Sequence, residues 1–155
     1  MGKEFHRLYK DEGVNKILTI EASGIAIGAM VAHEFGFPLV FAKKNKTKNI
    51  AGDVYTAPVE SFTHGKTYNI MVSKKFLNPG DKVLIVDDFL AIGNALKGLI
   101  SLVKESGAEL VGCGTVIEKG YQHGGDKLRA EGIRVESLAI IESMDADKGE
   151  IVFRD

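Results

Sequence analysis

Two adjacent carboxylates, Asp87 and Asp88, follow four apolar residues in the stretch VLIVDDFLAIGNA, residues 83–95. Neighbouring acids repel each other and are costly to bury, so a pair at the end of an apolar strand needs a chemical reason. Carboxylate oxygens can accept hydrogen bonds from a vicinal diol, or they can hold a metal ion that bridges to one. From spacing alone, the alternative is that the acids form only a polar strand end and a helix N-cap.

The residues after the acids form a Gly-containing turn at the start of a predicted helix. Those that would offer backbone amides there are Ala91, Ile92, Gly93, Asn94 and Ala95. Unpaired N–H groups at a helix N-terminus, together with the helix dipole, attract anions such as phosphate. An acidic pair beside such a turn predicts a sugar phosphate ligand, with its hydroxyls on the acids and its phosphate on the amides.

These residues need a scaffold, and the chain alternates predicted strands with predicted helices. Short apolar runs predict strands at 16–20, 38–42, 83–86, 109–117, 135–140 and 150–154. Helical spacing predicts helices at 3–12, 25–35, 92–103 and 125–131. The second of these is apolar on nearly all sides, which predicts a well-buried helix. Residues 53–77 alternate with a period near two and predict a hairpin or a long mobile excursion.

Continuously apolar strands that alternate with helices indicate a mainly parallel sheet covered on both faces. We therefore expect one α/β domain over residues 1–155, with the hairpin as an insertion. In such folds ligands bind where strands end and helices begin. Three loops would meet at that edge, and they are 21–24, 87–94 and 118–124.

Composition limits the classes of function. The chain has 155 residues and a net charge of −1, from 20 basic and 21 acidic residues, which argues against a general nucleic-acid binder. The single cysteine, Cys113, permits no internal disulfide and lies in an apolar pattern typical of a buried structural thiol. No apolar run approaches the roughly 20 residues that span a bilayer, and the charged start MGKEFHRLYK is unlike a secretory signal. We expect a cytoplasmic protein with neither a nucleic-acid nor a membrane partner.

The stretch 83–95 also resembles the 5-phosphoribosyl 1-diphosphate (PRPP) motif of the type I phosphoribosyltransferases. Further segments of the chain resemble, in the same order, the bacterial members of this family that act on xanthine. These segments are TIEASGIA (19–26), PLVFAKK (38–44), VESFTHG (59–65), VIEKGYQ (116–122) and RVESLAIIESM (134–144). The resemblance extends over essentially the whole chain. It implies the type I phosphoribosyltransferase fold and a purine-salvage reaction in which a purine nitrogen displaces pyrophosphate from PRPP.

The resemblance implies roles for the residues around PRPP. Asp87 and Asp88 would be the catalytic acids, which engage the ribose hydroxyls and stabilise developing positive charge, while residues 91–95 would hold the 5′-phosphate. The residues that would bind the pyrophosphate are Glu21, Ala22, Ser23, Gly24, Lys43 and Lys44. Mg²⁺ would be the cofactor, bridging the pyrophosphate and the ribose hydroxyls. On the residues alone, the two lysines could equally belong to a solvated basic loop.

The base would be read by Lys119 and Tyr121. In the resembled enzymes a lysine at the position of Lys119 donates to the oxygen at purine C6. This contact suits a 6-oxopurine, because lysine has donors only. The implied base is xanthine, with hypoxanthine or guanine as alternatives, and Tyr121 would stack on it. Without the resemblance, a surface lysine and an ordinary packed aromatic are the simpler interpretations. Residues 60–75 match the family's mobile loop, for which the alternative is an ordinary exposed hairpin.

Two features depart from the family. Ile92 stands where related sequences have a small or polar residue, so backbone amides would do most of the phosphate binding. The resembled enzymes also have a few dozen residues before the first helix, forming part of a hood over the base, and we expect this chain to lack them. We further expect a homodimer. A non-catalytic PRPP-binding regulator, or a homologue that binds without turnover, is the alternative class.

Overall fold

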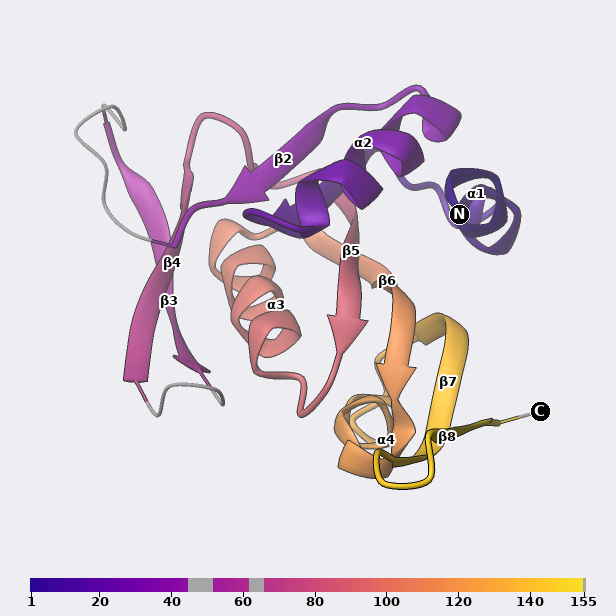
Figure 1. The fold of residues 1–155 in the computed structure, drawn as a ribbon. Helices are drawn as coiled ribbons and strands as arrows, with labels where there is room; N and C mark the ends of the chain where they lie inside the picture. Colours follow the sequence, from indigo (N-terminus) through magenta and orange to yellow (C-terminus); the bar gives the residue numbers. More distant parts are fainter. Residues whose placement is uncertain (45–51, 62–65, 155) are drawn as a thin grey trace.

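A computed structural model describes residues 1–44, 52–61 and 66–154 (Figure 1). Its elements are α1 (Gly2–Tyr9), β1 (Lys16–Ile20), α2 (Gly24–Phe35), β2 (Leu39–Ala42), β3 (Val54–Ser61), β4 (Lys66–Ser73), β5 (Lys82–Leu90), α3 (Asn94–Ser106), β6 (Glu109–Lys119), the 3-10 helix η1 (Gly120–Gln122), α4 (Gly124–Ala130), β7 (Val135–Asp145) and β8 (Glu150–Phe153). The predicted alternation of strands and helices is confirmed.

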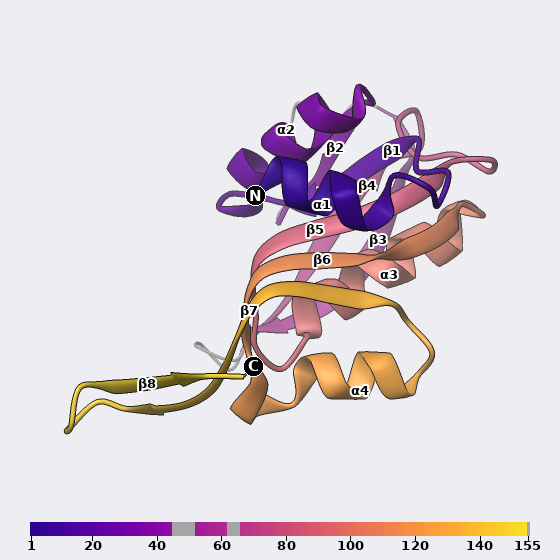
Figure 2. The same ribbon diagram turned by 90° about the vertical axis from the view of Figure 1, so that its right-hand side faces the viewer.

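Six strands form the main sheet in the order β2-β1-β5-β6-β7-β8. All neighbours pair in parallel except β7 and β8, which pair antiparallel. Helices α1 and α2 cover one face, and α3 and α4 cover the other (Figure 2). One core therefore includes Phe5 and Leu84, and the other includes Leu99 and Ile85, all of them 0% exposed. Burial on both faces explains why the central strands are continuously apolar.

Strands β3 and β4 form a separate antiparallel hairpin. It packs against α3, where a Cβ on Gly98 would lie 2.5 Å from a methyl group of Val59 and 3.1 Å from one of Ile70. A backbone bridge between Lys43 and Met71 joins the hairpin to the end of β2. The predicted hairpin is confirmed, and residues 62–65 of the predicted mobile loop 60–75 lie outside the described residues.

The predicted end of the strand at Val86 is wrong. Strand β5 continues to Leu90, because its backbone ladder with β6 runs on through the pairs Asp87–Thr115 and Phe89–Ile117. The two acids therefore lie within a strand instead of in the loop after it. A charged residue ends an apolar pattern in the sequence, but it does not end backbone pairing.

The prediction that residues 25–35 form a well-buried helix is also wrong. The buried residues of α2 are Gly24, Gly28 and Val31, whereas Met30 is 54% exposed. Helix α2 lies over the β2 and β1 side of the sheet, and none of the helices and strands that the structure describes covers its outer surface (Figure 1). Apolar composition alone does not reveal which side of a helix another element covers.

The sequence predicts a buried structural thiol at Cys113 and no membrane-spanning segment. Cys113 is 0% exposed in β6, and this burial raises the pKa of its thiol to about 12. A neutral buried thiol is a poor nucleophile, so the predicted structural role is confirmed. Across residues 1–44, 52–61 and 66–154, no helix has both the length and the apolarity to cross a membrane.

Candidate functional site

The two acids of β5 have different surroundings. Asp87 is 4% exposed, and burial, followed by the neighbouring Asp88 side chain, raises the pKa of its carboxyl to about 7 even though Lys44 opposes the shift. Asp88 is partly exposed. The Asp88 N–H donates to Asp87 Oδ1 at 3.0 Å, and the Phe89 N–H donates to Asp88 Oδ1 at 2.9 Å. Gly93 is the N-cap residue of α3, so neither acid caps that helix.

The predicted phosphate loop, residues 91–95, lines a cavity of about 260 Å³ at the start of α3. Gly93 has φ 94°, a left-handed conformation that turns the chain from β5 into the helix. The Asn94 side-chain amide donates to the Glu60 carbonyl at 3.1 Å, which ties the helix start to the hairpin. Backbone N–H groups at this turn form the kind of cavity that suits a phosphate.

The predicted pyrophosphate loop, residues 21–24, lies beside the acidic pair. A Cβ on Gly24 would lie 3.0 Å from Asp87 Oδ1 and would also overlap the hydroxyl of Thr19, so the start of α2 needs glycine here. Thr19 Oγ1 is buried without a hydrogen-bond partner in the described part of the chain. The Glu21 carboxylate accepts the Lys44 N–H at 2.7 Å. Glu21 therefore braces one loop against the next.

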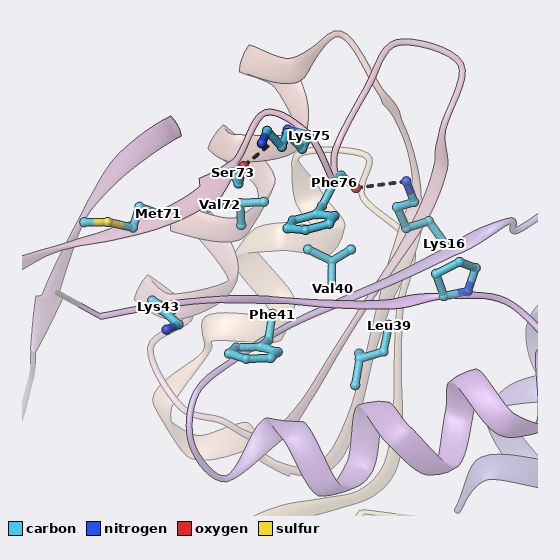
Figure 3. Close-up of a pocket in the computed structure, with 11 residues that line it drawn as sticks. Lys16, Leu39, Val40, Phe41, Lys43, Met71, Val72, Ser73, Lys75 and Phe76 are labelled. Carbon is cyan, nitrogen blue, oxygen red and sulfur yellow. Dashed lines mark hydrogen bonds between the residues drawn. The ribbon is translucent and has the colours of Figure 1, made fainter. Parts of the chain in front are cut away.

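The two predicted lysines lie in different places. Lys44 lines the phosphate-loop cavity, where its ammonium is 5.8 Å from the ring centre of Tyr68. Burial, followed by the charge of Asp87, raises the pKa of the Tyr68 phenol. Lys43 instead lines a larger cavity of about 540 Å³, whose other lining residues include Val40 of β2 (Figure 3). The structure thus brings Lys44, and not Lys43, to the wall of the phosphate-loop cavity.

The two predicted base-binding residues lie at the end of β6 and just after it. Lys119 is the last residue of the strand, and its ammonium is 5.7 Å from the ring centre of Phe89, which is 48% exposed. Tyr121 lies in η1, is 38% exposed, and donates its hydroxyl to Met144 Sδ at 3.5 Å. Exposed rings offer stacking surfaces for a flat base, and the ammonium offers donors to a carbonyl oxygen.

Sequence reasoning missed two aromatic residues of this region. Phe89 lies beside Lys119 and also lines the phosphate-loop cavity. Its place between the two acids and the Gly-containing turn was a usable signal, because a residue there must lie close to both. Tyr68 reaches the cavity through the packing of the hairpin on α3, and the sequence contains no local signal for that packing.

The fold and this edge of the sheet define a class of protein. Residues 3–145 match the family described as the phosphoribosyl transferase domain, and the chain belongs to that family. The expected type I phosphoribosyltransferase fold is thereby confirmed.

Two curated relatives are named xanthine phosphoribosyltransferase. That of Lachnoclostridium phytofermentans is 59% identical over 154 residues, which are 99% of this chain and 79% of the relative. That of Bifidobacterium adolescentis is 55% identical over 155 residues, with 99% and 80% covered.

Two solved structures with the same fold are described as adenine enzymes. The APRTase of Giardia lamblia, complexed with 9-deazaadenine, has a TM-score of 0.81 and 30% identity, and the match covers 92% of this chain and 78% of that one. Adenine phosphoribosyltransferase from Rhodothermus marinus has a TM-score of 0.78 and 26% identity, with 90% and 77% covered.

Proposed function

We propose that this chain transfers the 5-phosphoribosyl group of PRPP to xanthine, forming xanthosine 5′-monophosphate and pyrophosphate in purine salvage. The main support is the convergence of the acidic strand end, the start of α3 and the start of α2 on one edge of the sheet. Asp87, Gly24 and Lys44 come from three loops or strand ends and lie around the same site. A sugar that bears both a phosphate and a diphosphate would contact all three.

The choice of base follows from the relatives and from Lys119. The relatives named for xanthine are 59% and 55% identical to this chain, about twice the identity of the structures named for adenine. A lysine ammonium donates to a C6 oxygen and repels a C6 amino group. Hypoxanthine or guanine is the second candidate, because each carries the same oxygen.

In the proposed reaction, different groups of the chain bind the 5′-phosphate, the pyrophosphate and the ribose. The amides of residues 91–95 bind the 5′-phosphate, and the start of α2 with Lys44 receives the leaving pyrophosphate. Asp87 and Asp88 accept hydrogen bonds from the ribose hydroxyls. Their negative charge stabilises the oxocarbenium-like C1 as its bond to pyrophosphate breaks and the purine nitrogen attacks. A cation beside Asp87 favours the ionised form of its carboxyl.

Mg²⁺ fits this arrangement as an ion that arrives with PRPP. Among the residues that the structure describes, no cluster of three or more His, Cys, Asp or Glu side chains could hold a metal ion. Mg²⁺ typically takes one or two carboxylates together with substrate phosphates, and Asp87 and Asp88 would supply the carboxylates. When bound, the ion would neutralise charge on the departing pyrophosphate.

We further propose that residues 1–155 form one domain that pairs as a homodimer. Met30, Phe37 and Phe41 are 54%, 42% and 38% exposed in the region of α2 and β2. A second copy would remove this apolar surface from water. Light scattering should give twice the chain mass, and Met30→Glu combined with Phe41→Glu should shift the mass toward one chain. A single-chain mass for the wild type would contradict this proposal.

Turnover with individual bases tests the proposed function. The chain is incubated with PRPP, Mg²⁺ and one of xanthine, hypoxanthine, guanine or adenine, and the nucleotide and pyrophosphate formed are quantified. We expect the highest kcat/KM with xanthine and the lowest with adenine. Binding of PRPP without product from any base would contradict the enzyme proposal and favour a PRPP-binding regulator.

A further inference from the structure

An ion pair between the buried Glu118 and the partly exposed Arg129 lies behind the proposed base and phosphate subsites. Glu118 is 0% exposed and immediately precedes Lys119 in β6. Arg129 of α4 donates to both carboxylate oxygens of Glu118, at 3.0 and 2.6 Å, and its Nε donates to the Val135 carbonyl at 3.1 Å. The hydroxyl of Ser137 in β7 donates to the same carboxylate at 2.5 Å. The pair thus joins α4 to β6 and β7.

The start of α4 lies between this ion pair and the phosphate loop, and its first two residues, Gly124 and Gly125, have no side chains. A Cβ on Gly124 would overlap the Ala91 carbonyl oxygen and would lie 2.6 Å from the Ile92 carbonyl carbon. A Cβ on Gly125 would lie 2.5 Å from the Glu118 carboxyl carbon and 2.7 Å from Arg129 Nη1. The backbone of the phosphate loop therefore rests on the helix that the ion pair holds.

The ion pair is charged at neutral pH. Burial alone would raise the pKa of Glu118, but hydrogen bonds from Arg129 and Ser137 and the positive charge of Arg129 hold it below its ordinary value. Bidentate pairs between arginine and a carboxylate fix orientation as well as distance. Because Lys119 is bonded to Glu118, the same contacts fix the point from which the Lys119 side chain starts.

We propose that Glu118 and Arg129 are positioning residues that hold the phosphate loop and Lys119 at a fixed separation. Neither residue lines the phosphate-loop cavity, so each would act through the neighbours that it holds. The inference rests on the proposed function of the two subsites, since the product joins a 5′-phosphate at residues 91–95 to a base at Lys119. The length of a nucleotide is fixed, so a displacement of about 1 Å between the subsites would slow the reaction strongly.

Glu118→Gln tests this role because it keeps the size of the side chain and leaves Arg129 without its bidentate partner. We expect the KM values for PRPP and xanthine to rise together by roughly fivefold or more, with a fall in kcat. Arg129→Gln should act in the same way, and the double variant should be no worse than the poorer single variant, because the two residues act as a unit. Ser137→Ala removes the hydroxyl that donates to Glu118 and also contacts Thr115 and Arg129, without stranding a charge. It should shift both KM values in the same direction by about twofold. If Glu118→Gln does not fold, the KM values of this milder variant test the positioning role.

Arg134→Gln is the matched control. Arg134 also makes several contacts, to Glu12, Glu136 and the Leu8 carbonyl, but these hold α1 and lie away from the proposed subsites. It should lower Tm and leave both KM values unchanged. If the Glu118 and Ser137 variants lower Tm and yet keep wild-type KM values well below Tm, the positioning role is overturned while the proposed function stands. Absence of turnover in the wild type would overturn both.

Discussion

The proposed phosphate and base subsites are built in different ways. The phosphate subsite is formed by backbone at residues 91–95 and 21–24, and its neighbour Asp87 is 4% exposed. The base subsite is formed by side chains, and two of them, Phe89 and Tyr121, are 48% and 38% exposed. The first region therefore depends on backbone groups beside a buried acid, and the second depends on side chains that are partly exposed.

This difference separates the two kinds of recognition. Backbone amides bind a phosphate group whatever base the nucleotide carries, whereas exposed side chains can change without disturbing the sheet. A single phosphate subsite could therefore serve enzymes with different bases. Substitutions should reveal this difference, because changes around the proposed phosphate subsite should affect the binding of PRPP. Changes in the proposed base subsite should affect the binding of the base.

The largest loss is expected from combining Asp87→Asn with Asp88→Asn. Two neutral amides cannot stabilise a developing cation at C1, so kcat/KM should fall by about 100-fold or more. Steady-state kinetics with PRPP and xanthine measure the change. Asp147→Asn, at an exposed acid after β7, should leave kcat/KM unchanged. Retention of activity within about threefold in the double variant would show that the acids are not catalytic.

Lys119→Ala should act on the base alone. Loss of a charged hydrogen-bond donor costs about 1.5–3 kcal/mol, so the KM for xanthine should rise roughly 10- to 100-fold while the KM for PRPP stays constant. The preference for xanthine over adenine should also shrink. Lys127→Ala removes an exposed lysine of α4 and serves as the control. Equal losses for both substrates would indicate a structural role for Lys119.

Gly124→Ala should affect PRPP more than xanthine. The added Cβ would press against the Ala91 carbonyl, and overpacking of this kind costs about 1–3 kcal/mol. We expect the KM for PRPP to rise about fivefold. Gly36→Ala is the control, because it strains the backbone at a residue with φ 70°, but its Cβ would meet nothing within 4 Å. A larger effect of Gly124→Ala on xanthine than on PRPP would contradict the proposed division.

A separate effect concerns folding rather than turnover. The pKa of Asp87 is raised from 3.8 to about 7 in the folded chain, so the folded state keeps a proton that the unfolded state releases. Ionised Asp87 therefore costs stability above pH 7, and the cost disappears as the pH falls toward 4.

Asp87→Asn removes this cost. Urea unfolding at pH 8 should show the variant to be more stable than wild type by on the order of 2–4 kcal/mol, and the gap should narrow at pH 4.5. An equal gap at both pH values would show that ionisation of Asp87 is not the cause.

Much of the fold was readable from the sequence because buried parallel strands need continuous apolar runs. The runs at 16–20 and 109–117 are examples, and the alternation in residues 53–77 correctly predicted a hairpin. The length of β5 was not readable, since its pairing continues past two charged residues. The exposure of Met30 was not readable either, because it depends on which surfaces other elements cover.

The candidate site shows the same limit. Asp87, Gly24 and Lys44 could be named because residue type and position in a loop indicated their chemistry, and the structure places them close together. Lys43 is also a lysine and directly precedes Lys44, yet it lines a different cavity. The pairing of Glu118 with Arg129 joins residues that are 11 positions apart and depends on how α4 packs. Contacts of that kind require the tertiary structure.

Titration of PRPP, with Mg²⁺ and without a base, tests the division between the two subsites most directly. Calorimetry compares wild type, Lys119→Ala and the Asp87→Asn/Asp88→Asn variant. We expect the Kd for PRPP to stay within about twofold of wild type in Lys119→Ala and to rise tenfold or more in the acid variant, since hydrogen bonds to charged groups contribute about 1.5–3 kcal/mol. Wild-type affinity in the acid variant, or an equal loss in Lys119→Ala, would contradict the assignment of the acids to the ribose.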